Sequence, residues 1–305
     1  MITFIEQIKE ELCHNNYEKR IKFIIFSSYF INRLKLILTS NGPMYSIETN
    51  YSFIARFLID CLKTNFKIMH TVSYSNINKF NGKRIYNITF AEKDFIEIRK
   101  IINDYTNTKN IDNFTIKENM GFLIGSFLSG GSISDVTKPI YHLEIRTNNR
   151  QYLRNIQKVI LSFNLSATML KRKYSYVIYI KKASEISDFL KCIGAINSMY
   201  KLEDTIISRD LSNQVHRLNN LDVSNINKST KAGESQVEMI KKIINTKFFK
   251  RQNEKFRHFC NIRINNPSAS LSEISKIFME KYKIHITRTG INHYIMKIKK
   301  YLNNK

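Results

Sequence analysis

The sequence has no tryptophan, and its 305 residues include only three prolines and nine glycines. So few turn-forming residues argue against a loop-rich all-β fold. Only four cysteines occur, with no Cys-x-x-Cys pair; they are Cys13, Cys61, Cys192 and Cys260. This spacing is not typical of a zinc ribbon or a thioredoxin-type site, and it fits reduced core thiols in a cytosolic protein.

Long apolar runs are also missing. The most apolar stretch, residues 23–38, is interrupted by Asn32, Arg33 and Lys35, so it is too short and too polar to cross a bilayer. The N-terminal segment carries acidic residues early and lacks the apolar core of a signal peptide. We therefore expect a cytoplasmic protein that does not act at a membrane, and we expect no cofactor.

Acidic residues are scarce: 25 Asp and Glu stand against 49 Lys and Arg, which gives a formal charge of +24. Codon bias in an AT-rich genome raises lysine, but by itself it does not leave basic residues at about twice the number of acids. The excess indicates double-stranded DNA as the partner. Hydrophobic residues make up 43% of the chain, which predicts a folded protein.

Two stretches, residues 24–103 and 121–195, share one order of predicted elements. In each, a helix with small residues precedes a hairpin whose last strand ends in Thr-Asn, at residues 49–50 and 147–148. An amphipathic helix, a second hairpin and a short helix follow. The sequence therefore predicts an α+β fold with two αββαββα repeats related by a pseudo-two-fold axis.

The later parts of the repeats also correspond. Asn81-Gly82 is a strong hairpin signal in the first copy, and the second copy is expected to turn near residues 171–173. The amphipathic helices carry equivalent apolar residues at helical spacing, namely Leu58, Leu62, Ile156 and Ile160.

Small residues recur every four positions in the first helix of each copy. Gly125 and Ser129 in the second copy correspond to Ser28 and Asn32 in the first. Glycine inside a helix costs about 1 kcal/mol relative to alanine, so another benefit is needed. Small side chains at this spacing let two helix backbones approach closely. We therefore expect the two helices to pack together on the axis, with each four-stranded sheet forming half of a saddle.

These paired helices resemble the motif helices of the LAGLIDADG homing endonucleases. In that family each helix ends in an acid, and the two acids hold divalent metal over the scissile phosphates; hard carboxylate oxygens suit Mg²⁺. Here Gly130 and Arg33 occupy the two acid positions, and neither side chain can bind a metal. We therefore expect no catalytic residues and no metal site.

A closer resemblance covers nearly the whole chain and is to the WhiA family. Its members are bacterial DNA-binding regulators in which a degenerate LAGLIDADG-like domain precedes a helix-turn-helix. The similar stretches are "GSFLSGGSISD", "YHLEI", "NLDVSNINKSTKAGESQVEMI", "SLSEIS" and "TRTGINHYIMKI". The resemblance implies a sequence-specific transcriptional regulator linked to cell division, associated with the nucleoid and without nuclease activity. Other transcription factors or RNA polymerase are further candidate partners.

We expect four segments along the chain. The two LAGLIDADG-like repeats are assigned to residues 1–110 and 111–205, a linker to 206–230, and a helix-turn-helix domain to 231–305. The linker is expected to enter a helix near Ala232. In the resembled family this stretch contacts DNA or the neighbouring domain, and the sequence leaves both open for Asn227 and Lys228.

The C-terminal part is strongly basic, with 18 Lys and Arg against 5 Asp and Glu in residues 225–305. Ser270 and Glu273 have capping-box spacing at the start of one predicted helix, and Thr287 is a suitable N-cap for the next. The apolar stripe of that last helix is Ile291, Ile295 and Ile298. The pattern predicts a helix-turn-helix, and a plain helical hairpin with solvated polar groups is the alternative.

Candidate DNA-contacting residues follow from this assignment. The N-terminal part of a recognition helix reaches base edges, and its outward residues here are Arg288, Thr289, Asn292 and His293. Lys297, Lys299 and Lys300 are expected to contact phosphates. Strand residues of the saddle are further candidates, namely His142, Arg146, Lys171, Arg172 and Lys173.

Two other functions are weighed against this one. An active homing-type endonuclease would need displaced acids, for which Asp135, Glu144 and Glu48 are candidates. An RNA-binding scaffold could stack tyrosines on single-stranded bases, although tyrosine at alternating strand positions is also a common β-former.

Overall fold

The structure is a computed structural model, and it divides the chain into two compact units, Met1–Ser208 and Arg209–Lys305. The predicted Asn81-Gly82 turn lies outside the described residues. The structure describes residues 2–40, 42–66, 68–76, 84–108 and 111–304.

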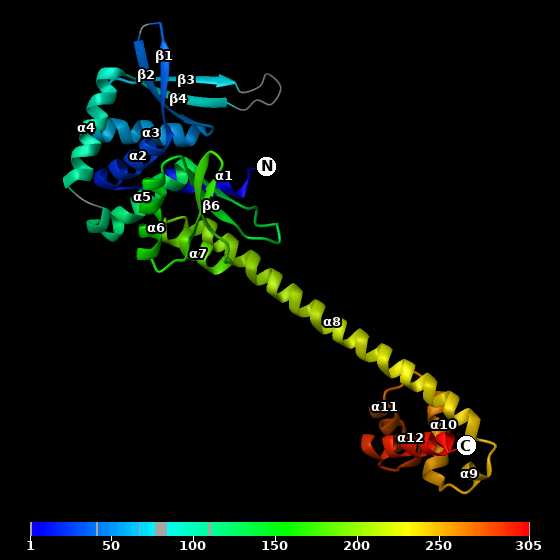
Figure 1. Ribbon diagram of the computed structural model, residues 1–305. Coiled ribbons are helices and arrows are strands. Elements are labelled where there is room, and N and C mark those ends of the chain that lie inside the picture. Colours follow the sequence, from blue (N-terminus) through cyan, green and yellow to red (C-terminus); the bar gives the residue numbers. More distant parts are fainter. Residues whose placement is uncertain (1, 41, 67, 77–83, 109–110, 305) are drawn as a thin grey trace. The chain divides into compact units, whose positions relative to one another are not determined.

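The first unit contains the two predicted repeats, and both have the predicted αββαββα order (Figure 1). A further helix, α1 (Phe4–His14), precedes the first repeat. The elements of the first repeat are α2 (Lys19–Arg33), β1 (Leu34–Thr39), β2 (Gly42–Thr49), α3 (Ser52–Asn65), β3 (Thr71–Asn76), β4 (Arg84–Ala91) and α4 (Glu92–Thr108). The second repeat consists of α5 (Ile116–Gly130), β5 (Gly131–Ile133), β6 (Leu143–Thr147), α6 (Arg150–Ser162), β7 (Thr168–Arg172), β8 (Ser175–Ile180) and α7 (Ala183–Cys192), after a short 3₁₀ turn η1 (Ile111–Asn113).

Each repeat forms its own four-stranded antiparallel sheet, in the order β1-β2-β4-β3 and β5-β6-β8-β7. The central strand pairs correspond between the repeats, because Ile47 lies opposite Ile88 and Ile145 lies opposite Ile178. All four isoleucines are buried. Alternation along these strands therefore buries one face of each sheet under its own helices. The predicted α+β class and repeat architecture are confirmed.

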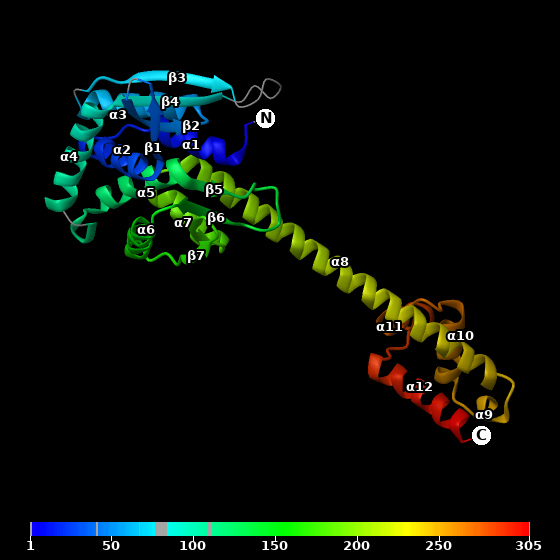
Figure 2. The same ribbon diagram turned by 45° about the horizontal axis from the view of Figure 1, so that its top comes forward.

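The two motif helices, α2 and α5, lie side by side between the repeats (Figures 1 and 2). A Cβ atom on Gly125 would lie only 2.3 Å from the carbonyl oxygen of Ile25 and 2.6 Å from Cβ of Ser28. One turn further along, the Asn32 Nδ2 donates a hydrogen bond of 2.9 Å to the Ser129 Oγ. The expected close crossing at the small residues is confirmed.

The amphipathic helices α3 and α6 close the cores of the two repeats. The predicted stripe of Leu58, Leu62, Ile156 and Ile160 is buried. Each helix follows a strand that ends in a threonine whose hydroxyl accepts a backbone hydrogen bond: Thr49 from Tyr51 and Thr147 from Asn149. The shared Thr-Asn signature therefore forms the same turn before each helix.

The cysteines are free thiols, as the sequence predicts for core residues. Cys61 and Cys260 are buried, and Cys13 and Cys192 are partly buried. Burial raises the pKa of all four thiols above the ordinary value. Raised pKa values keep these groups protonated and poorly nucleophilic.

The second unit is helical. It comprises the later part of the 48-residue helix α8 (Ile196–Ile243), followed by α9 (Lys247–Lys250), α10 (Glu254–Asn265), α11 (Leu271–Tyr282) and α12 (Arg288–Asn303). Residues 206–230, expected to link the domains and to enter a helix near Ala232, lie inside α8. The expected helix start is wrong because residues 196–232 contain no proline or glycine to end the helix that begins at Ile196.

Candidate nucleic-acid interface

Helix α12 carries the residues predicted to read DNA. Thr287 is the N-cap, and its hydroxyl accepts a hydrogen bond of 3.2 Å from the Gly290 backbone N–H. The apolar stripe of the helix, Ile291, Ile295 and Ile298, is buried in the core of the second unit, as predicted. Burial of this stripe leaves the remaining faces of α12 available to solvent.

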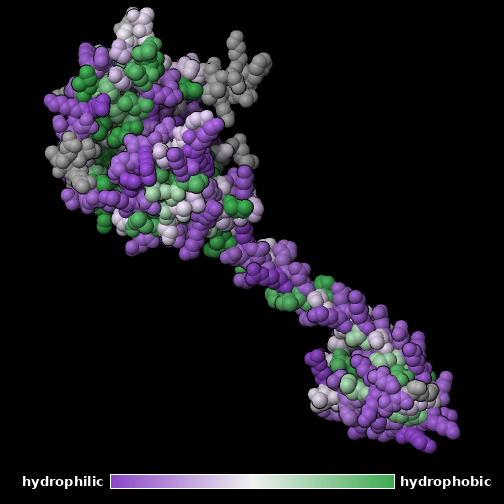
Figure 3. Space-filling view, viewed as in Figure 1, coloured by the Kyte–Doolittle hydropathy of each residue, from purple (hydrophilic) through white to green (hydrophobic). Residues whose placement is uncertain are grey.

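The structure places every predicted α12 contact residue on the exposed surface. These residues are Arg288, Thr289, Asn292, His293, Lys297, Lys299 and Lys300. The face of the second unit displayed in Figure 3 is predominantly hydrophilic. Along α12, Arg288, Thr289, Asn292 and His293 lie in the first turns. Lys297, Lys299 and Lys300 lie in the C-terminal half of the helix.

Helix α11 positions α12. Its predicted capping box is confirmed, because Ser270 N donates to the Glu273 carboxylate at 2.7 Å and Glu273 N donates to the Ser270 hydroxyl. Lys283 ends the helix in the left-handed region, with φ of 54°. The Ser275 hydroxyl then donates to the Ile286 carbonyl, which ties α11 to the segment just before α12.

Arg263 is a buried cation that the sequence analysis missed. The residue is 1% exposed, and its Nη1 donates to the carbonyl oxygens of Asn266, Pro267 and Ala269 at 3.3, 3.4 and 2.6 Å. Burial lowers the pKa of its guanidinium. Arg263 lies at helical spacing from Phe256 and Phe259, on one face of α10, and this spacing was the signal in the sequence that could have indicated its burial. Arg263 therefore holds the loop that leads into α11.

The ends of the two motif helices show what replaced the acids of the resembled nucleases. The Arg33 Nε donates to the Ser129 carbonyl oxygen in the last turn of α5, where a cation complements the helix dipole. A Cβ atom on Gly130 would lie 2.2 Å from the Arg146 carbonyl oxygen. The backbone of β6 therefore leaves no space at residue 130 for a carboxylate side chain.

A polar cavity of about 390 Å³ lies at this point, lined by residues that include Asn32, Arg33, Gly130, Glu144 and Arg146. Within the described residues, no group of three or more His, Cys, Asp or Glu side chains is placed to hold a metal ion.

Comparisons with known proteins agree with this geometry. Residues 119–212 match the model of the WhiA LAGLIDADG-like domain, and residues 215–302 match that of the WhiA C-terminal HTH domain. A probable cell division protein WhiA from Clostridium botulinum is 30% identical over an alignment of 311 positions. The alignment covers 98% of this chain and 97% of the relative.

The chain belongs to the WhiA family.

Two further WhiA proteins extend the comparison. The probable cell division protein WhiA of Clostridium acetobutylicum is 29% identical, with 98% of this chain and 97% of the relative covered. The crystal structure of full-length WhiA from Thermotoga maritima has a TM-score of 0.57 at 22% identity, and the match covers 99% of this chain and 98% of that one. This likeness supports the fold: a LAGLIDADG-like domain followed by a helix-turn-helix domain.

None of the helices in the described part of the chain is long and apolar enough to cross a bilayer.

Three of the five basic residues predicted at the second sheet lie in a cluster around Glu144. Arg172, Arg146 and His142 lie 2.8, 3.3 and 3.3 Å from its carboxylate oxygens. Partial burial alone would raise the pKa of Glu144, but the hydrogen bond to His142 and the charges of Arg172 and Arg146 hold it below its ordinary value. Two of the predicted DNA-contacting residues, Arg146 and Arg172, thus share a carboxylate, and both are exposed, as are Lys171 and Lys173.

The acids of the endonuclease alternative are engaged in local interactions. The Asp135 carboxylate accepts hydrogen bonds from the Thr137 backbone N–H and hydroxyl at 2.8 and 2.7 Å. Glu48 pairs with Lys35. Together with the Glu144 cluster, these contacts do not favour a displaced catalytic site.

The predicted linker residues Asn227 and Lys228 are exposed on α8. Lys228 also lines a cavity of about 1110 Å³ inside the second unit, together with Lys276 of α11 and Arg288 of α12. The structure therefore brings Lys228 and Arg288 to one hollow, a grouping that sequence distance alone did not indicate.

Proposed function

We propose that this WhiA-family protein is a sequence-specific regulator of transcription that binds double-stranded DNA through α12. The observation that carries the proposal is the exposed N-terminal face of α12, where Arg288 and Asn292 lie one turn apart. Arginine pairs with guanine and asparagine with adenine by bidentate hydrogen bonds in the major groove. The excess of basic residues favours the same partner.

The names of the relatives suggest the process that is regulated. Both clostridial relatives are called probable cell division proteins. We propose that this chain likewise acts in cell division, on the nucleoid in the cytoplasm, where other transcription factors or RNA polymerase are candidate partners.

Specificity should be separable from general affinity on α12. Asn292→Ala is expected to lose about 1–3 kcal/mol of binding free energy on the specific site and little on random DNA, because the base contact is lost. Lys300→Ala should weaken both complexes equally and lower the salt slope by about one, because a phosphate contact carries no sequence information.

Fluorescence anisotropy with specific and scrambled duplexes at several salt concentrations measures both effects, after chromatin immunoprecipitation with sequencing has supplied the site. Lys300→Ala is the matched control for Asn292→Ala, since both residues are exposed on one helix. Equal weakening of both duplexes by Asn292→Ala would show that α12 is not the recognition helix. Arg146 and Arg172 of the second sheet would then be the next candidates.

We further propose that the LAGLIDADG-like domain does not cleave DNA. Arg33 and Gly130 stand at the positions of the metal-binding acids, and phosphodiester hydrolysis of this type needs acids that converge on the ions. Purified protein is expected to leave plasmid DNA intact in Mg²⁺ or Mn²⁺, as judged on agarose gels. Site-specific cleavage that Asp135→Ala or Glu144→Ala abolished would establish the endonuclease instead.

A further inference from the structure

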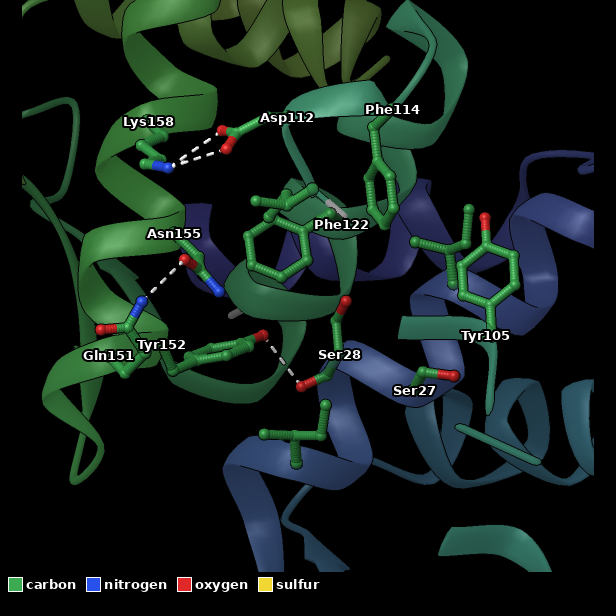
Figure 4. A pocket seen from close by; sticks show the side chains of 13 residues that line it. Ser27, Ser28, Tyr105, Asp112, Phe114, Phe122, Gln151, Tyr152, Asn155 and Lys158 are labelled. Carbon is green, nitrogen blue, oxygen red and sulfur yellow. Dashed lines mark hydrogen bonds and ion pairs between the residues drawn. The ribbon is translucent and has the colours of Figure 1, made fainter. Parts of the chain in front are cut away.

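A second cavity in the first unit, of about 330 Å³, shares no lining residue with the cavity beside Gly130 (Figure 4). Its walls come from α2 and α4 of the first repeat, from the segment after α4, and from α5 and α6 of the second repeat. Besides isoleucine and serine side chains, the lining contains four aromatic and two amide side chains: Tyr105, Phe114, Phe122, Tyr152, Gln151 and Asn155. This volume is near the lower end of the range of volumes found for ligand pockets, so the cavity could hold one small molecule.

The pseudo-symmetry explains where this cavity comes from. A shift of 98 positions aligns Thr49 with Thr147 and Leu58 with Ile156. The same shift aligns Phe53 and Phe57 of α3 with Gln151 and Asn155 of α6, which are lining residues. Two equivalent positions, one turn apart on the helix, are therefore occupied by aromatic side chains in the first repeat and by amide side chains in the second.

The equivalent position in the first repeat is filled. Tyr17 lies two residues before α2, as Phe114 lies two residues before α5. The Tyr17 ring packs edge-on against Phe57, with 5.9 Å between centroids, and Phe57 is buried. Phe114 and Asn155 instead both line the cavity, and the ring of Phe122 lies between them in Figure 4. Replacing a phenyl ring by a short amide removes volume that close packing would otherwise occupy.

The polar groups of the cavity define what it can recognise. The Gln151 Nε2 and the Asn155 Oδ1 are 3.5 Å apart, at the outer limit of a hydrogen bond, and the Asn155 amide points toward the cavity in Figure 4. The Tyr152 hydroxyl already donates to the Ser28 carbonyl oxygen at 2.9 Å and contacts the Ser126 hydroxyl. Tyr152 therefore offers its ring, and the amides offer hydrogen bonds.

The cation nearest the cavity is already paired. Lys158 Nζ contacts both carboxylate oxygens of Asp112 at 3.0 and 3.1 Å, and both side chains are about half exposed at the rim. A ligand with a free negative charge would have to displace Asp112. The cavity therefore favours an uncharged, flat molecule with a hydrogen-bonding edge.

We propose that this cavity binds a free purine nucleoside. The aromatic side chains would contact the base, and the Asn155 amide would take the adenine edge, as asparagine does by bidentate hydrogen bonds to N6 and N7. Because the walls come from both repeats, the bound nucleoside would hold them together and stabilise the first unit in proportion to its concentration.

The test uses the full chain and adenosine as the probe, with affinity measured by isothermal titration calorimetry and stability by thermal unfolding. Adenosine is expected to bind and to raise the melting temperature. Asn155→Phe, which gives α6 the residue found at the same place in α3, should abolish binding and leave the melting temperature equal or higher. Gln157→Ala, on the same helix but not among the lining residues, is the control and should bind as the unchanged chain does.

Two further measurements do not depend on Asn155→Phe folding. Asn155→Ala should lower adenosine affinity at least about tenfold, and 7-deazaadenosine, which lacks N7, should bind the unchanged chain weakly. No adenosine binding up to about 1 mM, or equal affinity of Asn155→Phe and the unchanged chain, would overturn the proposal. Binding of decanoate but not adenosine would also overturn it, because the cavity would then be a purely apolar site.

Discussion

Gly125→Leu is expected to lower the free energy of unfolding of the first unit by about 3 kcal/mol or more. A Cβ atom alone would lie 2.3 Å from the Ile25 carbonyl oxygen, which is a backbone atom and cannot turn aside. The two motif helices would have to separate, and the hydrogen bond between Asn32 and Ser129 would be lost with them. Urea denaturation followed by circular dichroism, with hydrogen exchange on peptides from α2 and α5, measures the effect.

Gly121→Ala is the matched control for this prediction. A Cβ atom on Gly121 would lie 3.1 Å from a methyl group of Ile21, which can move, and alanine favours the helix by about 1 kcal/mol. Gly121→Ala should therefore change stability little, whereas even Gly125→Ala should be destabilising. Wild-type stability and exchange protection in Gly125→Leu would show that the helices do not cross closely at this residue.

Arg263→Met is expected to destabilise the second unit by about 3–5 kcal/mol, because three carbonyl groups of one loop would lose a buried charged donor at once. These carbonyls, on Asn266, Pro267 and Ala269, belong to the loop before α11. The loop also meets α8, where a Cβ atom on Gly233 would lie 1.8 Å from the Pro267 carbonyl oxygen. Chemical denaturation and hydrogen exchange on peptides from α10 and α11 provide the measurement.

Arg257→Met controls for the loss of a positive charge, since Arg257 is exposed on the same helix as Arg263. It should leave the stability of the second unit within about 0.5 kcal/mol of the original. DNA affinity should fall in Arg263→Met only to the extent that α11 and α12 lose their fold. Equal stability of the two variants would mean that water replaces the guanidinium at the loop without loss.

Sequence alone determined the elements whose signals are local. The repeated αββαββα order follows from periodicities and turn residues within short windows, and the structure confirms it. The capping box of Ser270 and Glu273 and the N-cap Thr287 were likewise predictable, because each signal lies within three or four consecutive residues. The loss of the acids, seen as Gly130 and Arg33, needed only the motif itself.

Tertiary structure decided what depends on residues far apart in the chain. Glu144 is paired with Arg172, 28 positions away, and Tyr152 with Ser28, 124 positions away. Helix α8 continues through the stretch predicted as a linker because nothing local ends it. The burial of Arg263 and the cavity at Asn155 arise where several elements meet. Side-chain environment is set by these packed neighbours, and a linear pattern does not contain their positions.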